Sequence, residues 1–467
     1  MDPKVMIGLE VHTQLNTKTK LFCGCSLENI ADAQPNSRTC ETCLGHPGSK
    51  PKVNRAAVEL AIKIALALGC KISEESFFSR KVYLYPDMSK NFQITQYEIP
   101  FAKDGSLEII DHEGKRKTIR IQRMQLEEDP AKLQHVGGNI TNADYTLVDY
   151  NRSGIGLVEV VTAPDFDTPR EARIFLQRLA AILEYLGVLT LGELALKADA
   201  NISLNGGARV EIKNITGFLE VEKALASEIV RQKVALETKQ KIERETRAWS
   251  DDLKTTLSLR KKEGEEDYGY IFEPDLPKME IDKALVLRIE KTLPELPHQK
   301  FERYQKEYKI TPELASAITA ELDLASLFEN VARKVDPRFA ATWMNILKKT
   351  LFYNDLLLKE AKLKEEQFVK LLKLAESGKI TDRGAEMVLR EIIKKPEKFE
   401  ELVKGFARVE DAEDIVSSVI KENQKAVQDY KAGNKKSLQF LLGEVIKKSG
   451  RRIDAREAIR FLEKKLK

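Results

Sequence analysis

Short apolar runs alternate with amphipathic stretches over roughly the first 290 residues, and this pattern predicts a region of mixed helices and strands. The β-branched runs Val158–Val161 and Arg209–Ile212 are bounded by Gly, Asn and Asp, as strands usually are. Ala56–Leu68 and Arg170–Leu186 carry apolar residues at helical spacing. Glu220–Thr246 is a longer helical pattern that is rich in Lys and Glu.

The pattern changes after Leu293–Pro297, where strand signals end, glycine becomes scarce and helical spacing continues to the end of the chain. Pro337, Gly378 and Pro396 interrupt that spacing and predict helix boundaries. A chain of 467 residues is too long for one ordinary hydrophobic core. We expect an α+β domain over 1–295, an all-α domain over 296–405 and a small all-α domain over 406–467.

The composition, 42% hydrophobic and 32% charged, is that of a folded protein in water. No apolar run approaches the roughly 18 residues that suggest a membrane span. Met1–Gly8 lacks the apolar segment of a secretory signal. We therefore expect a cytoplasmic protein without a membrane partner.

The net charge of +4 is unevenly distributed. Residues 431–467 contain twelve Lys or Arg and four Asp or Glu, a net +8 on a mildly acidic body. A basic tail favours docking of a polyanion, although a solvated helical face has the same composition. Gly443 and Gly450 are expected to break the helical pattern, which puts the basic pairs near turns. The candidate nucleic-acid contacts are Lys435, Lys436, Lys447, Lys448, Arg451 and Arg452.

Four of the five cysteines form two close pairs, Cys23 with Cys25 and Cys40 with Cys43. A disulfide framework is not expected in a reducing cytosol, whereas two thiolate pairs match the four soft donors of a tetrahedral Zn²⁺ site. Because four protein ligands leave no position for water, such a zinc is structural. The alternative is four unrelated buried thiols. Cys70 lies on the apolar face of a predicted helix and is expected in the core.

Two acidic segments are candidates for a cation or proton-transfer site. Gly8–His12 alternates like a strand, so Glu10 and His12 point to the same face, where they can bind a divalent metal or manage a proton. Residues 127–129 are three acids in a row, and repelling carboxylates are tolerated when a cation lies between them. An ordinary surface pair and a solvated acidic turn remain the alternatives.

The segment Asp149–Glu159 combines a polar, glycine-containing loop with an entering strand, and such a loop can let a phosphate approach the backbone. The sequence contains neither a P-loop nor a dinucleotide-binding fingerprint. It also lacks a serine- and glycine-rich loop with a paired lysine, as in an amidase, and a cysteine in the setting of a glutaminase nucleophile. If this protein uses ammonia, another protein must therefore produce it.

Several longer motifs, in order along nearly the whole chain, resemble those of the GatB family, the B subunits of aspartyl/glutamyl-tRNA amidotransferases. The C-terminal motifs resemble the tail domain that this family shares with YqeY-type proteins. The segments that carry the resemblance are Ile7–His12, Tyr85–Gln96, Leu126–Asp129, Asp199–Ser203, Glu211–Asn214, Glu245–Arg247, Glu273–Pro277, Asp429–Lys435 and Leu441–Gly443.

The resemblance implies a cradle domain with a kinase-like site, a helical domain and a YqeY-like tail that binds tRNA. It implies that ATP phosphorylates the esterified side chain of mischarged Asp-tRNA(Asn) or Glu-tRNA(Gln), and that ammonia then converts it to Asn-tRNA(Asn) or Gln-tRNA(Gln). The implied partners are the GatA amidase, which supplies the ammonia, and the GatC subunit of a heterotrimer.

The cofactors that the resemblance implies are ATP and Mg²⁺, beside the structural Zn²⁺. The implied catalytic and cofactor-binding residues are Glu10, His12, Glu128 and Glu159, with Glu127 close behind. Lys213 and Asn214 are implied contacts of phosphate or of the aminoacyl end.

Two other functions are compatible with the sequence. A catalytically silent tRNA-binding scaffold would explain the basic tail, but a pure binder of a polyanion has no use for clustered carboxylates. The related GatE subunit shares the cradle and tail but carries a large extra domain between them, which 467 residues cannot hold. The GatB-type amidotransferase subunit is therefore favoured, with the choice between Asp-tRNA and Glu-tRNA left open.

Overall fold

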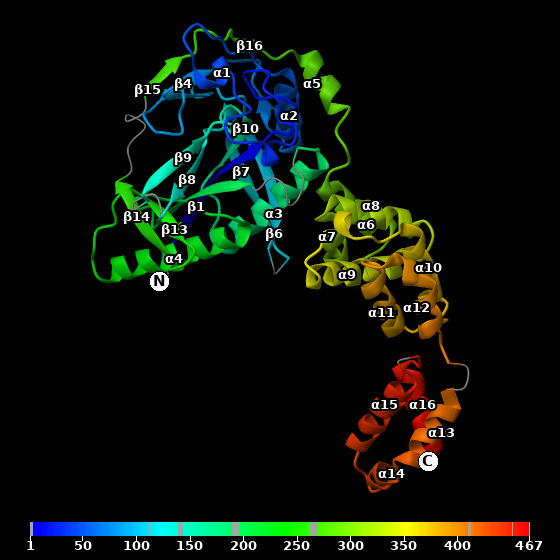
Figure 1. Ribbon diagram of the computed structural model, residues 1–467. Coiled ribbons are helices and arrows are strands. Elements are labelled where there is room, and N and C mark those ends of the chain that lie inside the picture. Colours follow the sequence, from blue (N-terminus) through cyan, green and yellow to red (C-terminus); the bar gives the residue numbers. More distant parts are fainter. Residues whose placement is uncertain are drawn as a thin grey trace. The chain divides into compact units, whose positions relative to one another are not determined.

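The structure is a computed structural model that describes residues 3–111, 114–138, 143–188, 196–261, 269–409, 412–450 and 452–466. The chain divides into two compact units, Met1–Pro297 and His298–Lys467 (Figure 1). The first unit combines sheets with helices, and the described part of the second consists of helices and their connections. The predicted order of an α+β part followed by an all-α part is confirmed.

The first unit contains strands of very different length. They are β1 (Val5–Gln14), β2 (Lys71–Ile72), β3 (Glu75–Ser76), β4 (Ser79–Val82), β5 (Phe92–Thr95), β6 (Ala102–Ile110), β7 (Arg116–Glu128), β8 (Lys132–Val136), β9 (Tyr145–Asp149), β10 (Gly156–Thr162), β11 (Lys197–Leu204), β12 (Val210–Lys213), β13 (Glu245–Ser250), β14 (Thr255–Lys261), β15 (Gly269–Phe272) and β16 (Met279–Glu280). Its helices are α1 (Glu41–Leu44), α2 (Arg55–Ala67), α3 (Pro169–Tyr185), α4 (Phe218–Glu237) and α5 (Lys283–Glu290).

Nine of the described strands form one sheet in the order β14-β13-β12-β11-β1-β10-β7-β6-β2. β1 is the central strand and pairs antiparallel with β10 on one side and β11 on the other. β12 and β13 pair parallel, and α4 makes the crossover between them. Because successive residues of a strand point to opposite faces, β1 buries Ile7, Leu9 and Val11 on one face and turns Glu10 and His12 to the other.

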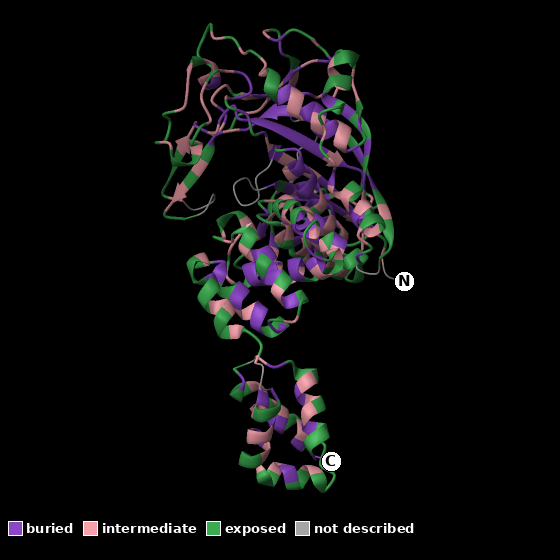
Figure 2. Ribbon diagram, turned by 90° about the vertical axis from the view of Figure 1, so that its right-hand side faces the viewer, coloured by how far each residue is buried: buried purple, intermediate pink, exposed green. Residues whose placement is uncertain are grey.

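Helices α3 and α4 pack against each other and against this sheet (Figure 1). α3 begins where the side chain of Thr168 accepts a hydrogen bond from the backbone N–H of Glu171, and Pro169 takes the first helical position. The apolar face of α3, with Phe175 and Leu176, is buried in the main core together with the inner face of the sheet. Figure 2 shows the strands of the nine-stranded sheet as largely buried.

The helix predicted over Glu220–Thr246 is too long. α4 ends at Glu237, Lys239 has a positive φ of 56°, and Glu245 already belongs to β13. Glu245 and Thr246 pair with Val210 and Glu211 of β12. This tertiary pairing overrides the helical preference of the Lys- and Glu-rich sequence.

A separate three-stranded sheet, β15-β4-β5, borders the main sheet, and β5 packs against β7. Arg80 on β4 makes a two-pronged bond to buried Glu273, with two N–O distances of 2.8 Å. Tyr97 and Tyr270 stack with ring centroids 3.8 Å apart. The hydroxyl of Thr95, at the end of β5, donates to Glu127 of β7, so the small sheet reaches the polar face of the large one.

The second unit is held by its own apolar cores. Its helices are α6 (Pro297–Glu307), α7 (Pro312–Thr319), α8 (Leu322–Ala332), α9 (Pro337–Tyr353), α10 (Glu365–Glu376), α11 (Asp382–Ile392), α12 (Phe399–Phe406), α13 (Ala412–Glu422), α14 (Gln424–Lys431), α15 (Lys436–Lys448) and α16 (Ala455–Leu466). Pro337 opens α9, Gly378 follows α10 with a φ of 70°, and Pro396 opens a 3-10 turn, so these three predicted boundaries are confirmed. None of the described helices is both long and apolar enough to cross a bilayer.

The last helices, α13 to α16, enclose a small core of their own that includes Val416, Leu441, Val445 and Leu462. The expectation that Gly443 breaks the helical pattern is wrong, because α15 runs through it. A glycine inside a helix costs only about 1 kcal/mol relative to alanine, and the buried Leu441 and Val445 on the same helix offset this. Gly450 does end the pattern, with a φ of 59°.

Candidate functional site

The polar face of the large sheet collects ionisable side chains from five neighbouring strands. Across β1, His12 stands opposite Glu159 of β10, and Glu159 stands opposite Gln125 of β7. In the other direction, Glu10 stands opposite Asp199 of β11. Since paired residues share a face, strand register alone assembles residues that are far apart in the sequence.

A first acidic group consists of His12, Glu127 and Glu159. Nε2 of His12 lies 3.5 Å from Oε1 of Glu127 and 3.8 Å from Oε1 of Glu159. Thr95 donates a hydrogen bond of 3.1 Å to Glu127, and the side-chain amide of Gln125 donates to Glu159. Both carboxylates are buried, whereas His12 is half-buried.

Burial and crowding favour the protonated form of Glu159. Burial and the neighbouring charge of Glu127 raise the pKa of Glu159 to about 7, although His12 opposes the shift. Burial by itself would lower the pKa of His12, but attraction to Glu159, Glu127, Asp199 and Glu10 outweighs it and raises the pKa. At neutral pH the group is thus poised between binding protons and binding a cation.

A second acidic group consists of Glu10, Asp199 and Glu211. Its negative charge is partly offset by Lys213 of β12, whose Nζ lies 2.8 Å from Asp199 and 3.5 Å from Glu211. Burial would lower the pKa of Lys213, but these two carboxylates raise it, so the ammonium stays charged. Asn201 donates a hydrogen bond of 2.9 Å to Glu10.

The buried acids 127–129 point in three directions and do not form a solvated turn. Glu127 faces His12, whereas Glu128 forms an ion pair with buried Lys90 and accepts a hydrogen bond of 2.9 Å from the backbone N–H of Ile94. Asp129 accepts a bond of 2.6 Å from Gln14. Among the described residues, the groups able to hold a metal include Glu127 and do not include Glu128.

Both acidic groups fit a divalent cation. In each, three ligand atoms lie within 4.8 Å of one another. Each also has a buried amide oxygen beside it, Oε1 of Gln125 and Oδ1 of Asn201, that has no hydrogen-bond partner in the described part of the chain. A buried acceptor without a donor is costly, and carboxylate and amide oxygens are the ligands that hard cations prefer.

The four predicted zinc ligands come together. The sulfur atoms of Cys23, Cys25, Cys40 and Cys43 lie within 4.8 Å of one another, and all are free thiols. Hydrogen bonds from Cys23 and from the backbone N–H of Cys40, together with the charge of Lys20, lower the pKa of Cys43 to about 5. The hydrogen bond to Cys43 raises the pKa of Cys23 and burial raises that of Cys25, so of these three cysteines only Cys43 has thiolate character. Four soft donors suit Zn²⁺. Cys70 lies apart from them in the main core, as predicted, but the expectation that it lies on a helix is wrong, because α2 ends at Ala67.

The cysteine segment is tied to the loops around it. The fully buried ammonium of Lys20 lies 3.6 Å from Sγ of Cys43 and donates a hydrogen bond of 3.1 Å to the carbonyl of Tyr150. The hydroxyl of Ser89 donates a hydrogen bond of 2.8 Å to the carbonyl of Cys43. Gly45 has a φ of 70°, and a Cβ there would meet Lys90 at 2.5 Å, so only glycine fits.

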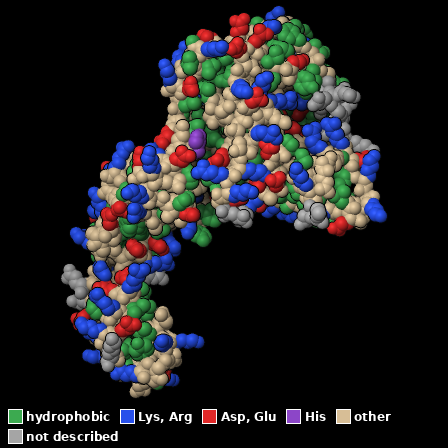
Figure 3. Space-filling model, turned by 180° about the vertical axis from the view of Figure 1, so that it is seen from behind, with side chains coloured by type: hydrophobic (Ala, Val, Ile, Leu, Met, Phe, Trp, Pro, Cys, Tyr) green, Lys and Arg blue, Asp and Glu red, His purple; other side chains and the backbone are tan. Residues whose placement is uncertain are grey.

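Other predicted residues lie elsewhere. Asn214 follows β12 in the left-handed conformation, with a φ of 62°. Lys435 and Lys436 stand at the start of α15 and Lys447 and Lys448 in its last turn; Lys448 pairs with Glu422 of α13. Arg452 donates 3.0 Å to the carbonyl of Ser449, and Arg451 lies outside the described residues. On the face seen in Figure 3, Lys and Arg side chains project from the helices at the C-terminal end.

The sequence-based site omitted four residues that the structure places in these groups. Asp199 and Glu211 alternate with apolar neighbours on β11 and β12, and that alternation was the available signal. Lys20 carried no signal, since an isolated lysine is usually a surface residue, and Lys90 was marked only by its place in the segment Tyr85–Gln96.

Comparison with known proteins finds matches to both the N-terminal and the C-terminal part of the chain. The family description "GatB/GatE catalytic domain" matches residues 5–287, and "GatB domain" matches residues 326–466. Among curated relatives, a protein of Methanospirillum hungatei is 45% identical over 97% of this chain and 96% of its own length. A protein of Haloquadratum walsbyi is 42% identical over 100% of this chain and 97% of its own length. A protein of Thermotoga sp. is 41% identical over 99% of this chain and 98% of its own length. All three are named as the B subunit of aspartyl/glutamyl-tRNA(Asn/Gln) amidotransferase.

Proposed function

Because the chain belongs to the family of aspartyl/glutamyl-tRNA(Asn/Gln) amidotransferase B subunits, we propose that its acidic sheet face activates the esterified side chain of the mischarged tRNA. The substrates are Asp-tRNA(Asn), Glu-tRNA(Gln) or both. The observation that carries the proposal is the pair of acidic groups, His12–Glu127–Glu159 and Glu10–Asp199–Glu211, side by side on one sheet face.

The reaction needs an activated carboxylate, because a free carboxylate is a poor acyl donor at neutral pH. The side-chain carboxylate attacks the γ-phosphorus of ATP, the bond to ADP breaks, and an acyl phosphate forms. Ammonia then attacks the acyl carbon, inorganic phosphate leaves, and the amide of Asn-tRNA(Asn) or Gln-tRNA(Gln) remains. Bound Mg²⁺ would supply neutralisation of the phosphate charge.

The chain's own residues position the reactants. His12, Glu127 and Glu159 form one cation site and Glu10, Asp199 and Glu211 the other, as their geometry permits. Lys213, held on its strand by Asp199 and Glu211, offers a fixed positive charge to a phosphoryl oxygen. Asn214 is proposed to contact the phosphate or the aminoacyl end.

Glu128 was expected as a direct cation ligand, and its ion pair with Lys90 supports a different role. Both side chains are buried, so each charge depends on the other. We propose that Glu128 fixes the segment Tyr85–Gln96 beside the acidic face, and that Glu127 supplies the ligand.

The four cysteines are proposed to hold one structural Zn²⁺. The ion would cross-link two short segments and, through Lys20 and Ser89, fix the loops at Tyr150 and Lys90. A structural role fits because all four donors come from the protein.

The proposed assembly is a heterotrimer. An amidase subunit, GatA, supplies ammonia to this chain, and GatC joins the two. The tail is proposed to bind the tRNA backbone through the six candidate contacts among its twelve basic residues. Since the substrate is an aminoacyl-tRNA, we place the assembly in the cytoplasm.

The test is tRNA-dependent cleavage of ATP. The reconstituted trimer is mixed with ATP and either Asp-tRNA(Asn) or Glu-tRNA(Gln), first without and then with an ammonia donor. Without the donor we expect ADP formation that needs the mischarged tRNA and is lost on replacing Glu127 with Gln, and addition of the donor should then release inorganic phosphate. A trimer that amidates with the donor but forms no ADP in either mixture would contradict the proposal and favour the scaffold function for this chain.

A further inference from the structure

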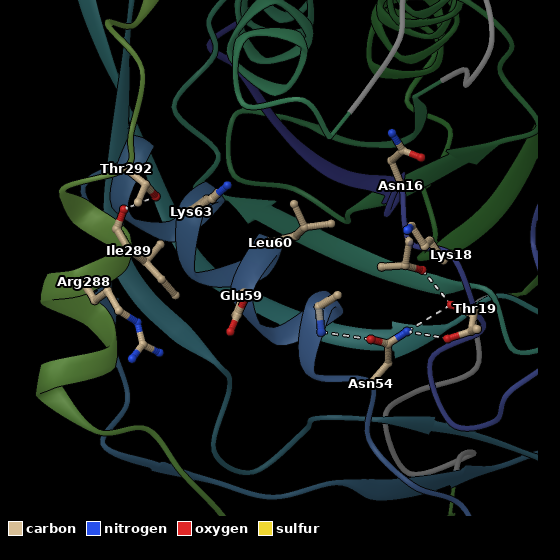
Figure 4. A pocket seen from close by; sticks show the side chains of 12 residues that line it. Asn16, Lys18, Thr19, Asn54, Glu59, Leu60, Lys63, Arg288, Ile289 and Thr292 are labelled. Atoms are coloured by element: carbon tan, nitrogen blue, oxygen red, sulfur yellow. Dashed lines mark hydrogen bonds between the residues drawn. The ribbon is translucent and has the colours of Figure 1, made fainter.

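A recess of about 600 Å³ opens in the first unit between α2, the end of α5 and the segment that follows β1. In Figure 4, Leu60 lies in its middle, with Ile289 and Thr292 on one side and Asn16 and Lys18 on the other. A volume of about 300–1,000 Å³ is typical of sites that hold a small ligand or a short segment. The recess shares no lining residue with the acidic or cysteine groups.

Three lining cations have no counter-ion in the part of the chain that the structure describes. Lys18, Lys63 and Arg288 form no ion pair within these described residues. The lining also includes one acid, Glu59, but Arg55 already bonds to it at 2.9 Å from outside the recess. The surplus of positive charge therefore favours an anionic occupant.

The rest of the lining is mixed. Ala56, Leu60 and the buried Ile289 make an aliphatic surface, and amide and hydroxyl groups surround it. A nucleic-acid backbone would place uniform negative charge against Glu59 and the aliphatic surface. A peptide matches better, because it offers carboxylates to the cations, N–H groups to the acceptors and an apolar side chain to Leu60.

The walls are already fixed. The side chain of Asn54 caps α2 and also donates a hydrogen bond of 3.0 Å to the hydroxyl of Thr19 (Figure 4). The hydroxyl of Thr292 donates a hydrogen bond of 2.7 Å to the carbonyl of Ile289. Asn54, Thr19 and Thr292 would therefore lose little side-chain freedom when an occupant binds, whereas ordering of the three cations would cost entropy. Asn16 follows the strand residue His12 by four positions, about 13 Å along an extended chain.

We propose that this recess binds a short acidic segment of a partner subunit, with an apolar side chain next to its carboxylates. The proposal rests on the proposed assembly with partner subunits, but it does not depend on the assignment of the acidic groups. The occupant would anchor the partner at the end of β1, the strand whose centre carries Glu10 and His12.

The experiment compares two full-length variants with matched charge change. Lys63→Glu with Arg288→Glu reverses charge inside the recess, and Lys103→Glu with Lys291→Glu does so at exposed positions outside it. Affinity for the purified amidase and small subunits of the same organism is measured without ATP or tRNA, at about 50 and 200 mM salt. We expect at least roughly tenfold weaker binding for the recess variant and a smaller salt dependence, with the control like wild type.

Binding of tRNA to the same variants separates the alternatives. Unchanged subunit affinity overturns the proposal, and a selective loss of tRNA affinity would assign the recess to nucleic acid instead. If the recess variant does not fold, a photo-crosslinking residue at Ala56, on the exposed rim, replaces it. Its crosslink must then map to an acidic stretch of a partner subunit, and any other product or none overturns the proposal. Because no ATP turnover enters these readouts, a failure of the phosphorylation proposal would leave them unaffected.

Discussion

At the scale of single residues, β7 shows how one step along a strand changes a side chain's role. Glu127 and Glu128 are adjacent and both buried, but the first faces His12 and the second faces Lys90. Their chemical identity gives no hint of this difference. Strand alternation does, once the register of β7 against β10 is known.

The matched variants Glu127→Gln and Glu128→Gln should therefore fail in different ways. Glu127→Gln relieves carboxylate repulsion, so we expect near-normal stability without metal but little stabilisation by added Mg²⁺. Glu128→Gln leaves Lys90 buried without its counter-ion and should lower the free energy of unfolding by about 3–5 kcal/mol. Chemical denaturation with and without Mg²⁺ measures both effects. The reverse pattern would restore Glu128 as the cation ligand.

Cation binding should depend on pH. With its pKa raised to about 7, Glu159 is protonated below that pH and ionised above it, and His12 also retains its proton to a higher pH than usual. A cation binds the deprotonated forms, so its affinity should rise as pH rises, by roughly tenfold per unit below pH 7 for one released proton. Calorimetric titration with Mg²⁺ between about pH 6 and 8 measures this slope. Glu159→Gln should flatten it, and a flat wild-type profile would contradict the assignment.

The sequence was sufficient for some of these residues and insufficient for others. Alternation over Gly8–His12 correctly put Glu10 and His12 on one face, because it depends only on local strand geometry. Asp199 and Glu211 join Glu10 only through pairing with strands roughly 190–200 residues away, which no local pattern encodes. The partners of buried Lys20 and Lys90 are tertiary contacts of the same kind.

At the scale of elements, the cysteine segment is a short stretch with little regular structure that nevertheless makes defined contacts. α1 has only four residues, and a helix this short is not stable by itself. Its neighbours Lys20, Ser89 and Tyr150 are fixed by hydrogen bonds to it or through it. A metal ion would supply the cross-link that secondary structure does not.

We predict about one Zn²⁺ per chain, held by the four cysteines. Cys40→Ser should lower the zinc content and the melting temperature, because one of the four soft donors is lost. Cys70→Ser is the control, since Cys70 lies in the core outside the cluster and should leave the zinc content unchanged. Elemental analysis together with thermal unfolding gives both values. A wild-type chain that is stable and free of zinc would rule the site out.

Pairing between strands explains why the predicted C-terminal end of one helix was wrong. The Lys- and Glu-rich stretch after Phe218 has the pattern of one helix, but the strand Glu245–Ser250 is fixed by its parallel pairing with β12. Helical spacing in α3 was interpreted correctly, because a buried apolar stripe and the Thr168 cap both specify it. Elements that are specified by their own sequence were predictable, and those specified by a neighbour were not.

At the scale of the whole molecule, chemistry and charge are separated along the chain. The acidic groups belong to the unit Met1–Pro297, and the basic tail belongs to His298–Lys467. The division into three domains, with boundaries near 295 and 405, stays a prediction. We expect substrate affinity to depend mainly on the tail and the chemical step on the first unit.

Removal of residues 406–467 should raise the KM for mischarged tRNA severalfold or more and reduce the salt dependence of binding, because neutralised phosphates release counter-ions. The first unit should stay folded, since the tail has a core of its own. A milder variant exchanges Lys435, Lys436, Lys447 and Arg452 for Gln and spares Lys448, which pairs with Glu422. Filter binding across a salt series measures the slope. Equal binding by intact and truncated chains at every salt concentration would show the tail to be a solvated surface.

The central position of β1 also affects how the chain can fold during its synthesis. This strand is synthesised well before its partners β10 and β11, which begin at Gly156 and Lys197. At about 5–20 residues per second, roughly 10–40 s separate the synthesis of Glu10 from that of Glu211. Both edges of this strand stay open until β10 has emerged, and one edge stays open until β11 has emerged; an open strand edge is exposed to aggregation. Holding factors and slower elongation should therefore matter most for the yield of this protein before residue 211 has emerged.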